Sequence, residues 1–381
     1  MRLRISLQSV SKALSTASTG QARAPFPIAV QELASFLRDN SPNIAVLTGA
    51  GVSTDSAIPD YRGQNGTYTL NPDYKPVFYQ AFVASDEARH RYWARSFLGF
   101  PPVLTTDPNP THYALAAFQS PSQAQLQSLA SSTASSSPLL DSSPTQGPAS
   151  PQSNSYIRTL ITQNVDGLHQ KAGTKDVIEL HGSLYRVKCM ACGHEKDRAE
   201  FQRILADLNP DWNDLIQSQT ATNLYARMNA DGDVEINTPD QQKLLSSYSS
   251  SHKLDYRTFQ YPTCSCCRTG DYKPSVVFFG ENVPADVRNR SLQTIQGANG
   301  LLVIGSSLAT FSAYRLVKLA KDTGIPIAMI NLGQSRGDSL ADLRYDESST
   351  QLLKAVAHEL GLGEIQGAIK RRKRTLNVVG S

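Results

Sequence analysis

The sequence predicts an α/β protein: a Rossmann-like, doubly wound parallel sheet with a smaller inserted zinc-binding module. Three observations lead to this fold class: continuous apolar segments alternate with helical ones, small or amide-bearing turns follow the apolar segments, and cysteines occur in two close groups. Unbroken apolar strands are typical of a parallel sheet that is covered on both faces. A chain of 381 residues is long enough for one large α/β domain and a small module.

Five short apolar segments, rich in β-branched residues, are the predicted strands. They cover residues 44–47, 156–161, 276–279, 301–304 and 325–330. Residues of helical period lie between them, for example over 312–321, where Gly324-Ile325-Pro326 marks the end of the helix. Strands that alternate with helices predict the doubly wound sheet.

The first strand runs into Gly49-Ala50-Gly51-Val52-Ser53, which is the start of a dinucleotide-binding turn. Glycines there let backbone N–H groups approach a pyrophosphate. Thr54 stands where the dinucleotide fingerprint has its third glycine, and Asp60-Tyr61-Arg62 follows instead of a continuing helix. Dehydrogenases place an acid after the second strand to hold the ribose, and no such strand and acid follow here.

Similar turns end the other strands: Thr162-Gln163-Asn164, Gly305-Ser306-Ser307 and Asn331-Leu332-Gly333. Ligands of open α/β sheets bind at this edge, so the turns together predict one nucleotide cleft. Asn164 and Asp166 offer an amide and a carboxylate for ribose hydroxyls or a carboxamide. His181 follows an apolar pair and is a candidate general base. Taken alone, His181 or His169 is more often an ordinary packed histidine.

The five cysteines occur as Cys189 and Cys192, then Cys264, Cys266 and Cys267. Two C-x-x-C pairs supply four thiolates, enough for a closed and therefore structural zinc site, and the chain shows no secretory signal that would favour disulfides. The 71 residues between the pairs exceed the usual spacing. We take Cys264 and Cys267 as the second pair, with a C-x-C arrangement through Cys266 left open.

Charge and composition set the chain ends and insertions apart. Of a formal charge of +4, residues 1–31 carry four basic and no acidic side chains and residues 370–374 carry five basic ones, which leaves −5 for the body. We therefore expect no direct nucleic-acid binding by the folded part, and no apolar run is long enough for a membrane span. Residues 119–155 are a Ser-, Gln- and Pro-rich insertion with little to bury.

The motifs above, with Glu179-Leu180-His181-Gly182 and Phe279-Gly280-Glu281, stand in the order found in sirtuins. The resemblance covers about residues 28–360, apart from two insertions. Four further segments are similar to the mitochondrial class II branch of that family, the branch with lipoamidase and ADP-ribosyltransferase activity: 91–95, 108–112, 208–210 and 231–233. Two departures concern the loop after the glycines, where Ala57 and Gly63 replace a usual glycine and serine.

The resemblance implies an NAD-dependent protein-lysine deacylase that moves the acyl group of an acyl-lysine to ADP-ribose and releases nicotinamide. It implies His181 as base, with Asn164 and Asp166 as further catalytic residues. The implied NAD contacts are Gly49, Ala50, Gly51, Ser53, Asp60, Tyr61, Arg62, Tyr68, Gln163, Asn164, Val165, Asp166, Gly305, Ser306, Ser307, Asn331, Leu332 and Gly333. The implied contacts to the acylated protein substrate, by β-augmentation, are Val277, Phe278, Phe279, Gly280 and Glu281. One structural Zn²⁺ would be held by Cys189, Cys192, Cys264 and Cys267.

We expect three regions along the chain. Residues 1–27 are Arg- and Ser-rich and free of acids, as in a mitochondrial presequence, which predicts the mitochondrial matrix; the basic residues of the 366–381 tail leave the nucleus as the alternative. Residues 28–365 form the catalytic domain. Within it, the Rossmann-like part covers 28–118, 156–185 and 274–365, the zinc module 186–273, and the low-complexity insertion 119–155. A non-catalytic NAD-sensing scaffold and a zinc-bearing dehydrogenase are the rival functions.

Overall fold

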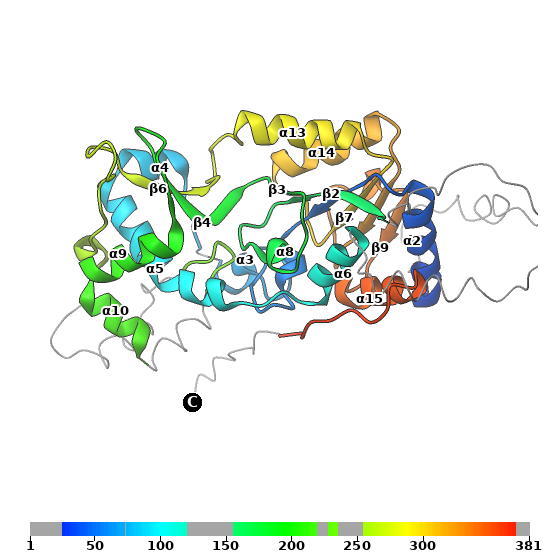
Figure 1. The fold of residues 1–381 in the computed structure, drawn as a ribbon, viewed down its shortest axis with the longest axis horizontal. Helices are drawn as coiled ribbons and strands as arrows, with labels where there is room; N and C mark the ends of the chain where they lie inside the picture. The colour runs from blue at the N-terminus through cyan, green and yellow to red at the C-terminus, as the bar shows by residue number, and fades with distance from the viewer. Residues whose placement is uncertain (1–24, 73, 120–154, 219–227, 235–253, 371–381) are drawn as a thin grey trace, which may run out of the picture.

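A computed structural model describes residues 25–72, 74–119, 155–218, 228–234 and 254–370. Its larger part is a six-stranded, wholly parallel sheet in the order β3-β2-β1-β7-β8-β9 (Figure 1). The strands are β1 (Ile44–Thr48), β2 (Ile157–Thr162), β3 (Val177–Glu179), β7 (Gly300–Ile304), β8 (Ile327–Ile330) and β9 (Leu343–Tyr345). The central strands β1, β7 and β8 are buried at every residue, which explains their continuous apolar sequence.

Helices cover both faces of this sheet, which confirms the predicted doubly wound fold. On one face the core contains residues of α2 (Phe26–Asn40), α6 (Pro110–Gln119) and α15 (Ser349–Glu359). On the other face it contains residues of α13 (Ala285–Gln296) and α14 (Phe311–Asp322). The predicted helix over 312–321 is thus α14.

The smaller part is built on a three-stranded antiparallel sheet, in the order β5-β4-β6. These strands are β4 (Gly182–Cys189), β5 (Glu195–Asp197) and β6 (Tyr272–Val276), and they share a core with α9 (Arg198–Leu208) and α10 (Pro210–Gln217). Residues of α4 (Tyr79–Ala84) and α5 (Asp86–Thr105) belong to the same core, although the sequence division placed them with the Rossmann-like part. In Figure 1 these elements form the end of the molecule away from α2 and α15.

Short elements complete the described chain: η1 (Ala50–Ser53), α3 (Thr67–Leu70), α8 (Leu168–Lys171), η2 (Tyr256–Thr258) and η3 (Asp338–Leu340). Among the described helices, none combines the length and the apolar character that a membrane crossing needs. Residues 1–24 of the predicted presequence, the 119–155 insertion except its first and last residues, and the tail beyond residue 370 lie outside the described residues. Residues 25–27, which were also assigned to the presequence, instead cap and begin α2.

One predicted strand was wrong. Residues 276–279 were expected in the parallel sheet, but Val276 ends β6 of the antiparallel sheet. The next three residues run between two other segments: the Val277 N–H donates to the His181 carbonyl (2.8 Å), and the Phe279 N–H donates to that of Val77 (3.3 Å). A short apolar run fits a strand in either sheet, so its sequence could not choose between them. β9 was not predicted at all, because Leu343–Tyr345 is only three residues long.

Candidate functional site

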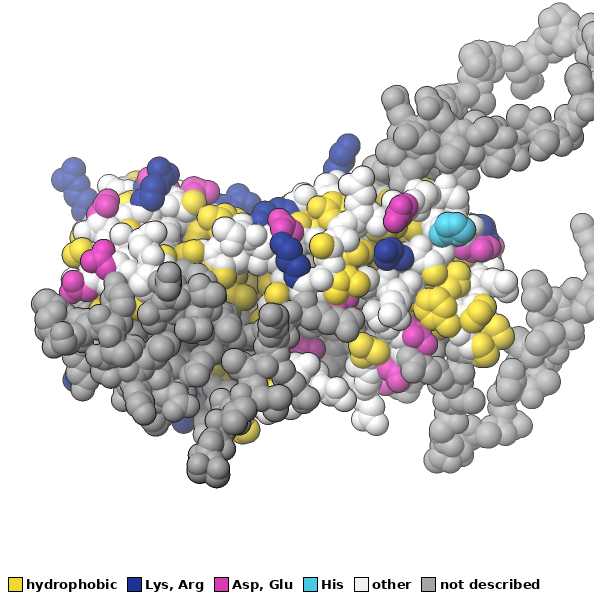
Figure 2. Space-filling view, turned by 90° about the horizontal axis from the view of Figure 1, so that it is seen from below, with side chains coloured by type: hydrophobic (Ala, Val, Ile, Leu, Met, Phe, Trp, Pro, Cys, Tyr) yellow, Lys and Arg dark blue, Asp and Glu magenta, His cyan; other side chains and the backbone are white. Residues whose placement is uncertain are grey.

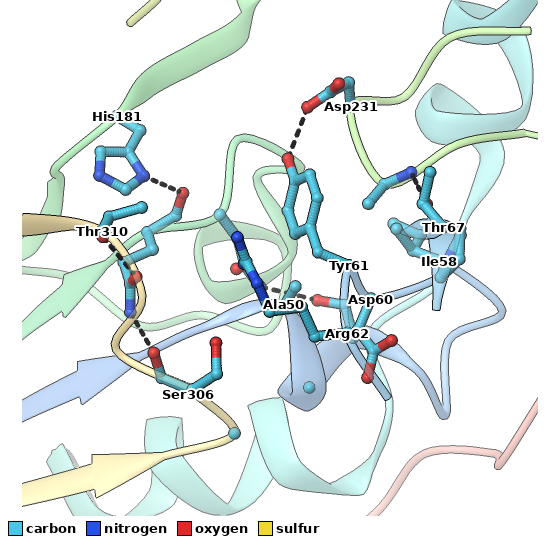
Figure 3. A pocket seen from close by; sticks show the side chains of 18 of the residues that line it. Ala50, Ile58, Asp60, Tyr61, Arg62, Thr67, His181, Asp231, Ser306 and Thr310 are labelled. Atoms are coloured by element: carbon cyan, nitrogen blue, oxygen red, sulfur yellow. Dashed lines mark hydrogen bonds between the residues drawn. The ribbon is translucent and has the colours of Figure 1, made fainter. Parts of the chain in front are cut away.

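A cavity of about 1720 Å³ lies at the carboxyl ends of β1, β2, β7 and β8 and extends to the smaller sheet (Figure 3). The turns that the sequence singled out line it together. The residues from the predicted set that line it are Ala50, Gly51, Ser53, Asp60, Tyr61, Arg62, Gln163, Asn164, Val165, Asp166, His181, Val277, Phe278, Phe279, Gly280, Glu281, Gly305, Ser306, Ser307, Asn331, Leu332 and Gly333. Gly49 and Tyr68, from the same set, are not among the residues that line it.

The glycine turns after β1 and β7 pack backbone against backbone. A Cβ on Gly49 would lie 2.7 Å from both the Gly305 carbonyl oxygen and the Ser306 Cβ, and one on Gly51 would lie 2.9 Å from the Gly305 oxygen. The Gly51 N–H donates to that oxygen (2.9 Å). Gly305 itself has φ +60°, a left-handed conformation that glycine adopts without strain. Side chains are therefore excluded here, and the cavity floor is backbone, as close approach of a dinucleotide requires.

A chain of polar contacts links the first turn to the one after β2. The Ser53 hydroxyl donates to Asp166 Oδ2 (2.7 Å) and accepts from Asn164 Nδ2 (3.0 Å). The Leu168 N–H donates to the other Asp166 oxygen (3.0 Å). Burial raises the pKa of Asp166, while these donors lower it, with the net shift upward. The result is a fixed amide and carboxyl at the cavity wall, suited to hold the hydroxyls and amide of a ligand.

His181 follows β3 and is fixed through both ring nitrogens. Its Nδ1 lies 3.1 Å from the Gln163 carbonyl oxygen, which can only accept, so Nδ1 carries the proton. Its Nε2, 2.8 Å from the Ser312 hydroxyl, therefore has the free lone pair and accepts from that hydroxyl. Burial lowers the pKa of His181 to about 4. At neutral pH this histidine is uncharged, oriented and able to take a proton.

Gln163 also organises the nucleotide end of the cavity. Its side-chain amide donates to the Ser306 hydroxyl (2.8 Å) and to the Thr48 carbonyl (3.2 Å), and the Thr310 hydroxyl donates to its Oε1 (3.3 Å). Its partners Ser306 and Thr310 lie on the same side of the cavity as His181 (Figure 3).

The segment 277–281 forms another wall and is supported from behind by a buried ion pair. Lys273 Nζ lies 3.0 Å from Glu281 Oε2, with the two side chains 10% and 22% exposed. The same carboxylate oxygen accepts from the Phe278 N–H (2.9 Å), and the ammonium lies 4.6 Å from the centre of the Phe278 ring. The ion pair thus holds the backbone of this wall in place.

The loop with Asp60, Tyr61 and Arg62 covers the cavity from the side of η1. Asp60 Oδ1 accepts from the Gly63 N–H (3.0 Å), and burial raises the pKa of Asp60. The Arg62 guanidinium lies 5.2 Å from the centre of the Tyr68 ring, a cation–π contact within the loop. Ala57, at the start of the loop, has φ +65°, the conformation for which a glycine is better suited.

The four predicted zinc ligands come together away from the cavity. The sulfur atoms of Cys189, Cys192, Cys264 and Cys267 all lie within 4.8 Å of one another. Two Sγ–Sγ distances are 3.7 Å, Cys189 to Cys267 and Cys192 to Cys264. Tetrahedral zinc with Zn–S bonds of about 2.3 Å requires sulfur separations of about 3.8 Å, whereas a disulfide needs about 2.05 Å. The cluster therefore fits one zinc ion, and Cys266, which is exposed, stands outside it.

Backbone N–H groups support these thiolates. The Gly270 N–H donates to Cys267 Sγ (3.3 Å), and the Cys192 N–H donates to Cys189 Sγ (3.5 Å). Hydrogen bonds from the backbone of Thr269 and Gly270 lower the pKa of the Cys267 thiol to about 6, which favours the ligating thiolate. A Cβ on Gly270 would lie 2.5 Å from Cys189 Sγ, so this position has no room for a side chain.

Four residues at these sites were not predicted from the sequence. Thr310, Ser312 and Asp231 line the cavity, and Gly270 lies beside the zinc ligands. Ser312 carried only a weak signal, as part of the helix expected just after the Gly305 turn. Asp231 stood in a segment that resembled a branch of a family but that suggested no role. Gly270 lies only three residues after Cys267, where a turn around a metal ligand is common.

Comparison with known proteins places the chain in a family. The Sir2 family model matches residues 49–130 and 149–312. The "NAD-dependent protein deacylase SIR4" of Batrachochytrium dendrobatidis is 42% identical over 332 residues, covering 86% of this chain and 92% of the relative. The "NAD-dependent protein deacylase Sirt4" of Drosophila melanogaster is 38% identical over 316 residues, or 83% and 82% of the two chains.

Solved structures share the fold. A Sir2 structure with a peptide and NAD⁺ has a TM-score of 0.55 at 24% identity and covers 88% of this chain and 99% of its own. A Sir2 structure bound to a propionylated peptide gives the same score, identity and coverage. With more than half of its residues matched by the family model, this chain belongs to the Sir2 family.

Proposed function

We propose that this protein is an NAD-dependent protein-lysine deacylase. The observation that carries the proposal is a neutral, doubly fixed His181 in the same cavity as the glycine turns and the Ser53–Asn164–Asp166 chain. The two relatives described above are named as NAD-dependent protein deacylases, which supports the same reaction. NAD is a substrate in this proposal, and it supplies the ribose carbon that accepts the acyl oxygen as nicotinamide leaves.

Each residue's proposed role follows from its position in the cavity. His181 Nε2 would take the proton of a ribose hydroxyl, because it is the acceptor nitrogen of an uncharged ring that lines the cavity. Asn164 would orient the ribose and the attacking water, and Asp166 would hold the nicotinamide amide. Segment 277–281 would pair with the backbone of the acylated protein substrate, supported by the Lys273–Glu281 pair. The zinc site, with four thiolates and no open position, would stabilise the smaller part.

Protein, rather than nucleic acid, is the proposed partner. On the face shown in Figure 2, Lys and Arg side chains are interspersed with Asp and Glu over the described residues, and do not form one basic patch. This agrees with the charge of −5 outside the two basic ends.

The direct test is a panel of lysine peptides that carry acetyl, propionyl, succinyl, lipoyl and biotinyl groups. We expect NAD-dependent removal of at least one acyl group, with one nicotinamide released per acyl lost, and loss of that turnover in His181→Tyr. Inactivity on every peptide, with transfer of ADP-ribose to protein instead, would contradict the deacylase and leave ADP-ribosyl transfer. Formation of reduced NAD would favour the dehydrogenase.

We also propose delivery to the mitochondrial matrix, supported by the composition of residues 1–27. Fusion of this segment to a fluorescent protein should direct it to mitochondria. A nuclear signal from the full-length fusion that disappears when residues 370–374 are neutralised would favour the basic tail as the address.

A further inference from the structure

A short segment of the smaller part, residues 228–234, contacts the loop that covers the cavity. The Tyr61 hydroxyl donates to Asp231 Oδ1 (2.6 Å), and the Tyr74 hydroxyl donates to Asp231 Oδ2. The Ala230 N–H donates to Thr67 Oγ1 (3.0 Å). The loop comprises residues 58–72. Tyr61 lies near its start, Thr67 in its middle, and Tyr74 just after its end. Figure 3 shows Asp231 above the Tyr61 ring and Thr67 beside it.

The segment itself is fixed to helix α5. Arg95 Nη2 lies 2.5 Å from Asp233 Oδ2, and the two side chains are only 3% and 2% exposed. The Val234 N–H donates to the Arg95 carbonyl (3.2 Å). The backbone at Gly232 (φ +69°) lies so close to α5 that a Cβ on Gly99 would be 2.3 Å from its carbonyl oxygen. Asp233 is therefore the anchor, and Asp231, two residues earlier, faces the loop.

We propose that residues 228–234 are a latch that holds the 58–72 loop over the cavity, with Asp231 as its positioning residue. The loop held in this way forms a wall of the cavity that would contain NAD, so the latch raises the affinity for NAD. This last step rests on the proposed function. Asp231 does not touch the reacting atoms, so it acts through Tyr61 and through the order of the loop.

The chemistry of the contact separates a latch from ordinary packing. Each carboxylate oxygen of Asp231 accepts one hydroxyl, so removal of one side chain frees both tyrosines at once. Burial raises the pKa of Asp231, and the hydrogen bonds from both tyrosines oppose that rise by stabilising the ionised carboxylate. Met228, Asn229 and Asp231 also line the cavity beside Tyr61 and Thr67, so the latch and the loop make one continuous wall. Removal of the Asp231 side chain should therefore disorder the loop but leave the contacts of Asp233 with α5 intact.

The test uses Asp231→Ala and, as an independent route, the pair Tyr61→Phe with Tyr74→Phe, which keeps both rings. Hydrogen–deuterium exchange of the protein without NAD reports loop order, and calorimetry reports the dissociation constant for NAD. We expect amides of residues 58–72 to exchange about tenfold faster in both variants, and the dissociation constant for NAD to rise about tenfold. The turnover rate of Asp231→Ala at saturating NAD should stay within about twofold. Asp231→Ala in the double-phenylalanine background should add little.

Tyr261→Phe is the matched control, since its hydroxyl donates to the carboxylate of Asp86, the first residue of α5, and not to residues 228–234. It should change neither loop exchange nor NAD affinity. Wild-type exchange over 58–72 in both test variants would overturn the latch, whether or not the enzyme deacylates. Faster exchange with unchanged NAD affinity would overturn the link to NAD. Equal losses of thermal stability and affinity in all three variants would also reject it, because they would indicate packing alone.

Discussion

Burial lowers the pKa of His181 and therefore the pH below which the enzyme should lose its uncharged base. An exposed histidine with a pKa of about 6.5 is neutral in only about 9% of molecules at pH 5.5. The His181 pKa of about 4 leaves about 97% neutral at that pH. The logarithm of kcat/KM should therefore stay flat from pH 8 to 5.5, where an exposed base would lose about tenfold in rate.

Ser312→Ala is the perturbation that tests this reasoning. The Ser312 hydroxyl donates to His181 Nε2 (2.8 Å) and so stabilises the neutral imidazole. A net hydrogen-bond contribution of about 1 kcal/mol corresponds to about 0.7 pKa units. Loss of the hydroxyl should raise the His181 pKa and move the acid limb upward by about that amount. Ser312→Thr, which keeps a hydroxyl, should restore most of the wild-type profile.

The assay is nicotinamide release with both substrates below saturation, because kcat/KM reports the free enzyme. Circular dichroism must accompany it, since a depressed histidine pKa also affects folding. The neutral form favours the folded state above the unfolded pKa of about 6.5, and this contribution disappears as the pH falls toward about 4. A wild-type acid limb centred near 6.5 in the folded enzyme, or a downward shift in Ser312→Ala, would refute the argument.

Three further predictions concern stability. Gly270→Ala should lower zinc retention and the melting temperature, because the new Cβ would lie 2.5 Å from Cys189 Sγ; zinc content by atomic absorption after gel filtration would check it. Asp233→Asn should lower the free energy of unfolding by about 3–5 kcal/mol, since it leaves the Arg95 charge buried, and equal urea midpoints would contradict this. Ala57→Gly should stabilise the protein by up to about 1 kcal/mol, because relief of a left-handed alanine (φ +65°) exceeds the entropy that glycine loses; a destabilised variant in urea unfolding would count against it.

Local signals in the sequence were sufficient for the four strands β1, β2, β7 and β8 and for the zinc ligands. A C-x-x-C pair places two thiolates within one turn, which favoured Cys189 with Cys192 and Cys264 with Cys267. The cluster confirms this choice over the C-x-C alternative through Cys266 that the sequence left open. Turns that follow buried strands meet at one sheet edge whatever their separation along the chain. This is why the glycine and serine turns converged in one cavity as predicted.

Contacts between distant segments were beyond a single sequence. The hydroxyl that donates to His181 comes from a serine 131 residues away, and the carboxylate that accepts from Tyr61 comes 170 residues later. Ser312 and Asp231 are ordinary surface residues by type, so only the packed chain reveals their partners. The same holds for residues 276–279, where the apolar run was recognised but its sheet was not. Such assignments depend on which neighbours compete for the same backbone groups.

Gln163 contacts both the proposed proton acceptor, His181, and the Ser306 turn that is expected to bind the nucleotide. Its backbone carbonyl fixes the tautomer of His181, while its side-chain amide holds the Ser306 turn. The His181 ring and the Ser306 turn are therefore both fixed by one residue directly after β2, which belongs to the sheet rather than to the smaller part. The covering loop, by contrast, is held through Asp231 from that smaller part. The base is thus oriented from the sheet, whereas the loop over the cavity is positioned by contacts from the smaller part. Loss of Asp231 should therefore weaken NAD binding while the base keeps its orientation.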